Sequence, residues 1–178
     1  MEGIQFLANL QDFDCCGNRL HSLKGISSLV YLRNLCCSRN LLLSLAEIST
    51  LENLQKLWCS SNSISSLKEI STLENLRDLR CSYNNLRSLK GILFLVNLQM
   101  LCCFDNFLRS LKYIPENVKH VSVDNNPISE TFSSSERILE LSGTSKFRIL
   151  GENVEKEDSY LKWFRGNKIS LERLYDLF

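Results

Sequence analysis

Cysteine is the residue type in this chain with the widest range of chemistry, and the 178 residues include eight of them. A thiolate can act as a nucleophile beside a base, as a zinc ligand where four donors converge, or as half of a disulfide. Five of the eight recur at a fixed spacing: Cys15, Cys37, Cys59, Cys81 and Cys103. This regularity indicates that a repeated structural element positions them.

The spacing belongs to an internal repeat of 22 residues, with a last step of 20. A leucine or other apolar residue stands two positions before each cysteine, so leucine and cysteine lie on the same face of a short predicted strand. An asparagine follows three positions after each cysteine, or after Val123 in the last unit, and is predicted to hydrogen-bond backbone groups in the turn. These asparagines are Asn18, Asn40, Asn62, Asn84, Asn106 and Asn126.

One such unit cannot bury its apolar face alone, so the units must stack with parallel strands about 4.8 Å apart. The five repeating cysteines are then expected to act as small apolar residues inside the stack. Their side chains would run parallel, whereas a disulfide needs them turned toward each other and zinc needs convergence on one point. We therefore expect reduced thiols with structural roles, and no metal or cofactor.

These units resemble the leucine-rich repeat family, in its 22-residue class with a leucine or cysteine at the inner strand position. The resemblance runs from about Ile4 to Ile128. It implies an α/β solenoid: a horseshoe segment over residues 1–128 with a parallel concave β-sheet of about six strands. Residues 129–178 would form a mainly helical C-terminal cap. The cysteine variant is similar to repeats from large DNA viruses of amoebae and some microbes.

Residues that flank the inner leucine and cysteine face the concave side of such a solenoid and are free of the packing demands of the repeat. Trp58 and Arg80 occupy equivalent positions on adjacent units, so they would lie side by side in one column that runs across the sheet. Both are residue types common among binding anchors. Two arrangements are open: the pair contacts a partner, or Arg80 stacks over a Trp58 that lies flat on its neighbours. The predicted partner-binding residues are Lys56, Trp58, Asp78, Arg80, Met100, Cys102 and Phe104.

A catalytic alternative rests on Cys102, because His120 lies one unit further along. A nucleophilic cysteine needs a base that is itself oriented by a third group, and the sequence indicates no such group. Cys36 shares the column of Cys102 but lies three units away, too far to pair with it. The sequence therefore favours a non-catalytic protein.

The convex side shows two further patterns. Ser49 with Glu52, and Ser71 with Glu74, fit capping boxes that would open short helical turns. The later "ILFLVNL" unit places apolar residues at the corresponding polar positions. Either a partner or the C-terminal segment of the chain is expected to cover this apolar patch.

Beyond Ile128 the repeat stops. "SSSERILELSG" predicts a helix from about Ser135 to Gly143, "KFRIL" an extended segment, and "EDSYLKWFRG" and "ISLERLYDLF" two more helices. Such a segment would cap the last repeat, or recruit other machinery. At the other end, the strand near Asp12 to Cys16 would present an open edge, which suggests a homo-oligomer or a partner.

Composition restricts the partners. The formal net charge is +1 with 44% hydrophobic residues, which gives no bulk attraction to nucleic acid or to anionic membranes. The sequence lacks an apolar run of about 20 residues and a secretory signal pattern, so we expect an intracellular, cytoplasmic protein, in the host cytoplasm or virion if viral.

The favoured function is a non-catalytic protein–protein interaction module that binds an unidentified protein. The alternatives are a self-assembling scaffold, such as a virion component, and a thiol-dependent or enzyme-recruiting activity.

Overall fold

The computed structural model describes residues 3–128, 138–142 and 146–150. The chain divides into two compact units, Met1–Glu130 and Thr131–Phe178. In the described part of the chain, no helix is long and apolar enough to cross a membrane.

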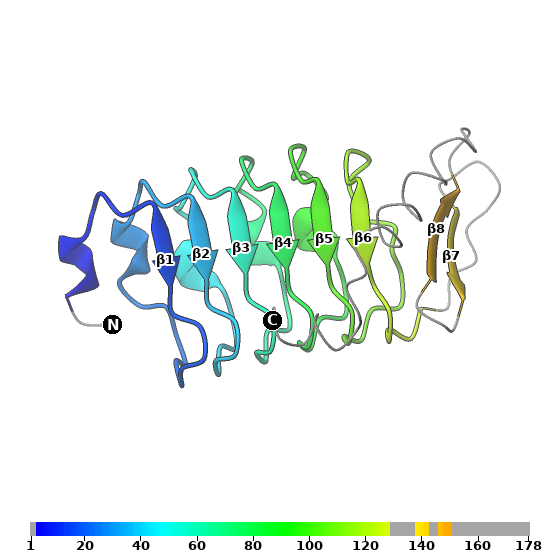
Figure 1. The fold of residues 1–178 in the computed structure, drawn as a ribbon, viewed down its shortest axis with the longest axis horizontal. Helices are drawn as coiled ribbons and strands as arrows, with labels where there is room; N and C mark the ends of the chain where they lie inside the picture. Colours follow the sequence, from blue (N-terminus) through cyan, green and yellow to red (C-terminus); the bar gives the residue numbers. More distant parts are fainter. Residues whose placement is uncertain (1–2, 129–137, 143–145, 151–178) are drawn as a thin grey trace, which may run out of the picture. The chain divides into compact units, whose positions relative to one another are not determined.

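The first unit is built on an open parallel sheet whose strands follow sequence order (Figure 1). Each strand is short and pairs in register with the same position of the next repeat, so Leu35, Leu57 and Leu79 form one buried column. This confirms the predicted solenoid sheet. The strands are β1 (Asp12–Asp14), β2 (Asn34–Cys36), β3 (Lys56–Trp58), β4 (Asp78–Arg80), β5 (Met100–Cys102) and β6 (His120–Ser122).

Short 3-10 turns return the chain along the side opposite the sheet (Figure 1). They are η1 (Ile4–Phe6), η2 (Ile26–Ser28), η3 (Ala46–Ile48), η4 (Lys68–Ile70) and η5 (Lys90–Ile92). The capping-box prediction is wrong, because Ser49 and Ser71 follow these turns rather than open them. Instead, the Ser49 hydroxyl donates to the Ala46 carbonyl at 3.2 Å. Because η3 ends at Ile48, the residues that follow Ser49 are not helical and present no helical amide for the cap.

The core between sheet and turns consists of stacked leucine, isoleucine and cysteine side chains. Cys37, Cys59, Cys81 and Cys103 are fully buried, and Cys15 at the first repeat is nearly so. Burial raises the pKa of each of these thiols, to about 11 at Cys15 and well above its usual range at the other four. All five are free cysteines that pack as small apolar groups.

An asparagine closes the turn after each strand of the solenoid: Asn40, Asn84 and Asn106 are buried, Asn62 and Asn126 are half-buried, and Asn18 is exposed. Asn84 illustrates the pattern. Its side-chain nitrogen donates to the carbonyls of Cys59, Cys81 and Ser82 at 3.0, 3.1 and 3.2 Å, and its oxygen accepts from the Ile64 amide at 2.9 Å. Asn40, Asn62, Asn106 and Asn126 repeat this pattern. Asn18, in the first repeat, donates to Cys15 and Cys16. We call this series the inner asparagine ladder.

A second asparagine series, not anticipated from the sequence, connects the repeats on the convex side. Asn75 donates to the Glu52 carbonyl at 2.9 Å, one repeat earlier. Asn53 donates in the same way to Val30, Asn97 to Glu74 and Asn117 to Leu98. The sequence could have predicted this series, because these asparagines are spaced by 22, 22 and 20 residues, as the last four asparagines of the inner ladder are.

The second unit contains a described antiparallel pair, β7 (Ile138–Ser142) and β8 (Lys146–Leu150). The helix predicted from Ser135 to Gly143 is therefore wrong over Ile138–Ser142, whereas "KFRIL" is extended as expected. In "ILELS", Leu139 and Leu141 alternate with polar residues, a period of two that favours a strand. The two helices predicted further on lie outside the described residues.

The inner ladder makes a direct prediction about stability. Replacement of Asn84 by alanine removes three donated hydrogen bonds and one accepted bond, and leaves backbone groups buried without partners. We expect a loss of roughly 3 kcal/mol in the free energy of unfolding, measured by urea titration. The adjacent Asn85 is exposed and provides a matched control, for which the alanine variant should change stability by less than about 0.5 kcal/mol. Equal losses for both variants would contradict the role assigned to the ladder.

Candidate binding face

The side chains of Trp58 and Arg80 stack on each other at the centre of the sheet. The two residues are register partners on β3 and β4, and the Arg80 Cζ atom lies 4.4 Å from the centroid of the Trp58 ring. This is a cation–π contact between a guanidinium and an indole face. The structure thus shows Arg80 stacked on the Trp58 ring, and in this arrangement both side chains stay partly exposed.

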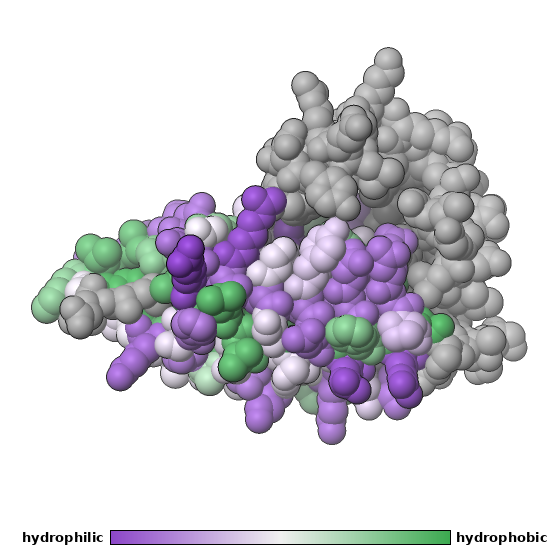
Figure 2. All heavy atoms as spheres, turned by 90° about the horizontal axis from the view of Figure 1, so that it is seen from below, coloured by the Kyte–Doolittle hydropathy of each residue, from purple (hydrophilic) through white to green (hydrophobic). Residues whose placement is uncertain are grey.

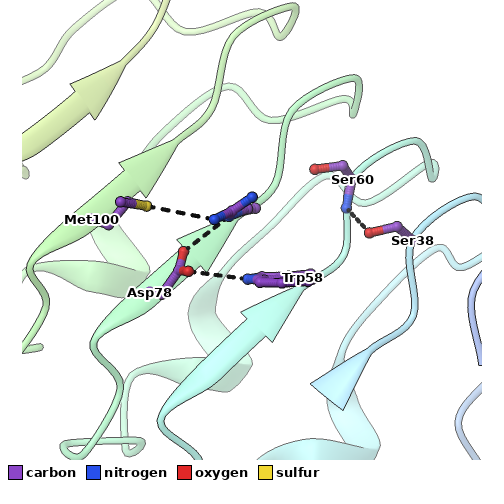
Figure 3. A network of polar contacts seen from close by, with 6 residues as sticks. Ser38, Trp58, Ser60, Asp78 and Met100 are labelled. Atoms are coloured by element: carbon purple, nitrogen blue, oxygen red, sulfur yellow. Dashed lines mark hydrogen bonds and ion pairs between the residues drawn. The ribbon is translucent and has the colours of Figure 1, made fainter. Parts of the chain in front are cut away.

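Asp78 holds this pair in place from the same strand as Arg80. Its Oδ1 atom accepts from Arg80 Nε at 3.3 Å, and its Oδ2 atom accepts from Trp58 Nε1 at 3.2 Å. Figure 3 shows Asp78 directed toward Trp58 across neighbouring strands, with Met100 on the other side. Arg80 Nη2 lies 3.9 Å from the sulfur of Met100. Four side chains from three adjacent strands therefore fix one another, and we call Trp58, Asp78, Arg80 and Met100 the central cluster.

The central cluster remains accessible from the concave side. The side chains of Arg80 and Asp78 are 24% and 14% exposed, and Trp58 and Met100 are half-buried. Lys56 is exposed and is the register partner of Asp78. The predicted residues Lys56, Trp58, Asp78, Arg80 and Met100 therefore form one continuous surface.

Phe104 lies at the end of this surface, where the chain leaves β5. Its ring meets the ring of Tyr83 edge to face, with centroids 5.1 Å apart and planes at 80°. Tyr83 itself adopts a left-handed backbone, with φ of 53°, at the turn before Asn84. The sequence indicated Phe104 but gave no sign that Tyr83 would support it.

Two cysteines at the N-terminal end of the sheet correct the expectation of reduced thiols. Cys16 and Cys36 form a disulfide, with their Cα atoms 5.8 Å apart. The sequence argument considered only residues at equivalent positions of different repeats, and it assessed Cys36 only as a partner for Cys102. Here the two cysteines are diagonal neighbours, because Cys36 pairs in register with Asp14 rather than with Cys16. The separation of 20 residues, two short of the repeat, was the signal for this pairing.

Similarity to known proteins agrees with this geometry. Residues 52–93 match a family model described as leucine-rich repeats in two copies. A leucine-rich repeat protein of Leptospira interrogans is 35% identical in sequence and superposes with a TM-score of 0.66 over 71% of this chain. The described solenoid is a leucine-rich repeat fold.

Two other solved structures share the leucine-rich repeat fold at lower identity. An internalin of Listeria monocytogenes is 20% identical, with a TM-score of 0.67 over 71% of this chain. Internalin C2 from the same organism is 23% identical, with a TM-score of 0.54 over 72% of this chain and 68% of its own. The chain covers only 38% of the first internalin and 34% of the Leptospira protein. No curated protein sequence matches the chain.

Within this leucine-rich repeat sheet, Cys102 is a poor nucleophile. Burial raises the pKa of the Cys102 thiol to about 11; the Arg80 guanidinium lowers the pKa and the Asp78 carboxylate raises it further. Register pairs Cys102 with Ser122, whereas His120 lies opposite Met100. The thiol of Cys102 and the imidazole of His120 are therefore diagonal neighbours on adjacent strands, as Cys16 and Cys36 are, and it is the raised thiol pKa that counts against a nucleophilic Cys102.

We expect alkylation of Cys102 to reflect this high pKa. Below its pKa the thiolate fraction grows tenfold per pH unit, so the rate should still rise tenfold between pH 8.5 and 9.5. A free thiol with a pKa of about 8.5 levels off over the same range. Replacement of Arg80 by alanine removes the neighbouring positive charge and should slow labelling at any fixed pH in this range. Site-resolved mass spectrometry measures both rates, and a plateau for Cys102 near pH 9 would contradict the assignment.

The Cys16–Cys36 disulfide should stabilise the first two repeats of the solenoid. Closure of a loop with a sequence separation of 20 corresponds to about 3 kcal/mol in the chain-entropy model. Urea unfolding, with EDTA present to keep metal ions off the reduced thiols, should therefore show a lower midpoint urea concentration for reduced than for oxidised protein. In the double variant Cys16→Ser, Cys36→Ser, reductant should leave the midpoint unchanged. A midpoint that is equal in oxidised and reduced wild type would contradict this stabilisation.

Proposed function

We propose that this leucine-rich repeat segment is a non-catalytic protein–protein interaction module whose partner binds on the concave face. The observation that carries the proposal is the central cluster, in which Trp58 and Arg80 are fixed by Asp78 on adjacent strands. Tryptophan and arginine are the residue types most often found to dominate binding energy at protein interfaces. The remaining proposed contacts are Lys56, Met100, Cys102 and Phe104.

Pre-organisation is the physical advantage of this arrangement. A flexible arginine loses side-chain entropy when a partner immobilises it, at a cost of about 0.5–1.5 kcal/mol for each such side chain. Here the Trp58 ring and the Asp78 carboxylate already hold the Arg80 side chain before any partner arrives. More of the contact energy then appears as affinity.

The charges around the central cluster suggest how a partner would be oriented. Lys56, Arg80 and Asp78 together leave one net positive charge at the middle of the concave face, whereas Asp12 and Asp14 on β1 bring negative charge to its N-terminal end. A partner segment with the opposite order of charges would bind in one direction only. Complementarity of this kind contributes to specificity and to the rate of association more than to raw affinity.

Self-association is a second candidate, favoured by one surface. Phe6, the last residue of η1, and Leu7, which follows it, are 83% and 52% exposed. Figure 2 shows hydrophobic side chains gathered toward the N-terminal end of the solenoid, whereas its middle is mainly hydrophilic on this side. An exposed apolar patch often marks a contact with another protein chain. Sedimentation velocity over a hundredfold range of concentration tests this candidate, because a monomer throughout would reject it.

Affinity capture under non-reducing conditions tests the interaction module. Wild-type protein and the double variant Trp58→Ala, Arg80→Ala serve as baits, and bound proteins are identified by mass spectrometry. We expect a captured protein whose recovery falls at least tenfold with the variant, since loss of an interface anchor costs about 2 kcal/mol or more. The affinity of the purified pair is then measured by calorimetry.

A matched control separates loss of the face from loss of the fold. Tyr31→Ala combined with Arg87→Ala removes an aromatic side chain and an arginine from exposed positions outside the sheet. This control should bind as the wild type does, and both variants should retain cooperative unfolding. Equal recovery with wild type and the Trp58, Arg80 variant would overturn the concave face as the binding site.

A further inference from the structure

The disulfide and one carboxylate form a group of potential metal ligands at the N-terminal end of the concave face. Asp14 ends β1, Cys16 follows it, and Cys36 ends β2. The ligand atoms of these three residues all lie within 4.8 Å of one another. Among the residues that the structure describes, this is the one such group of three potential ligands.

These two cysteines differ from the others in their surroundings. Cys15 and Cys37, their sequence neighbours, point into the core and are buried. Cys16 and Cys36 are half-buried on the opposite, concave side. Small molecules and ions in solution can therefore reach this sulfur pair and not the buried series.

The surrounding hydrogen bonds are of the kind that supports a ligand set. The Ser38 amide donates to the sulfur of Cys16 at 3.2 Å, and the Cys16 amide donates to Asp14 Oδ1 at 2.9 Å. The first bond favours a negatively charged sulfur, and the second fixes the direction of the carboxylate. Such bonds around metal ligands orient them and tune their affinity.

We propose that reduction of the Cys16–Cys36 disulfide creates a binding site for a thiophilic divalent cation such as Zn²⁺, with Cys16, Cys36 and Asp14 as ligands. Thiolate and carboxylate are both established zinc ligands, and three protein ligands leave a fourth position for water. Two thiolates and a carboxylate this close together repel one another, and the cation neutralises that charge. The disulfide and the metal site are alternative states of the same two sulfurs.

A small-molecule disulfide can act as the oxidant that converts the reduced, cation-bound pair into the Cys16–Cys36 disulfide. One cysteine thiolate attacks the oxidant, forms a mixed disulfide and releases one thiolate. The second cysteine then attacks the protein sulfur of that mixed disulfide, closes the Cys16–Cys36 bond and releases the second thiolate. Two electrons pass from the protein to the oxidant, and the cation loses two of its ligands and dissociates.

Zinc titration of the full chain tests the proposal. Protein reduced with a phosphine, which is then removed under nitrogen, is titrated with Zn²⁺ against a chromophoric chelator. We expect one Zn²⁺ per reduced chain and none for the oxidised wild type, which has the same sequence. Oxidised glutathione added to the zinc form should release Zn²⁺ together with two equivalents of reduced glutathione. With Co²⁺ as the probe, a sulfur-to-metal charge-transfer band should appear only after reduction.

Variants then identify the ligands. Cys16→Ser and Cys36→Ser should each weaken zinc binding at least a hundredfold, and Asp14→Asn at least tenfold. Cys102→Ser removes another half-buried cysteine of the same face and should bind as the reduced wild type does. Reduced wild type that retains its circular dichroism but takes up no Zn²⁺ would overturn the proposal. So would zinc binding that survives both cysteine substitutions or occurs equally in the oxidised chain. None of these readouts depends on the protein partner.

Discussion

The solenoid depends on one recurring interaction, the closure of each turn by an asparagine that is buried or half-buried in every repeat after the first. After its strand the chain turns sharply and leaves backbone carbonyls and amides facing the interior, where they are shielded from water. An unpaired group of this kind costs about as much as a lost hydrogen bond. Asn84 pairs with groups of its own repeat and of the preceding one. The ladder therefore satisfies each turn and also locks the spacing between neighbours.

That fixed spacing determines what each cysteine can do. In the first five repeats, the strict register of the strands directs the cysteine three positions before the ladder asparagine into the core, where burial raises the pKa of its thiol. Only the cysteines that face away from the core can react with solutes or form a disulfide. Of these, Cys102 is partly enclosed by its neighbours, and its thiol pKa is raised to about 11. Cys16 and Cys36 lie near the end of the sheet, where a diagonal approach brings them together.

The sequence predicted the features that recur and failed where neighbouring repeats differ. The period of 22 residues was sufficient to place every strand of the solenoid sheet, the inner ladder and the columns of the concave face. Periodicity compares like positions, so it could not reveal a diagonal contact such as Cys16–Cys36. It also could not decide how Arg80 would lie, because the stack on Trp58 depends on a carboxylate at Asp78 that no repeat rule requires. In "ILELS" the repeat had ended, and the helical prediction overlooked an alternation of two.

The two features of the concave face also differ in what they require from the sheet. The central cluster uses side chains from three interior strands, which have hydrogen-bonded neighbours on both sides and little freedom to shift. The Cys16–Cys36 pair joins β1, which pairs only with β2 among the described strands, to the rest of the sheet. End strands of a repeat stack open most readily, since each repeat contacts only its neighbours. A covalent link placed there restrains a strand that has a hydrogen-bonded neighbour on one side only among the described strands.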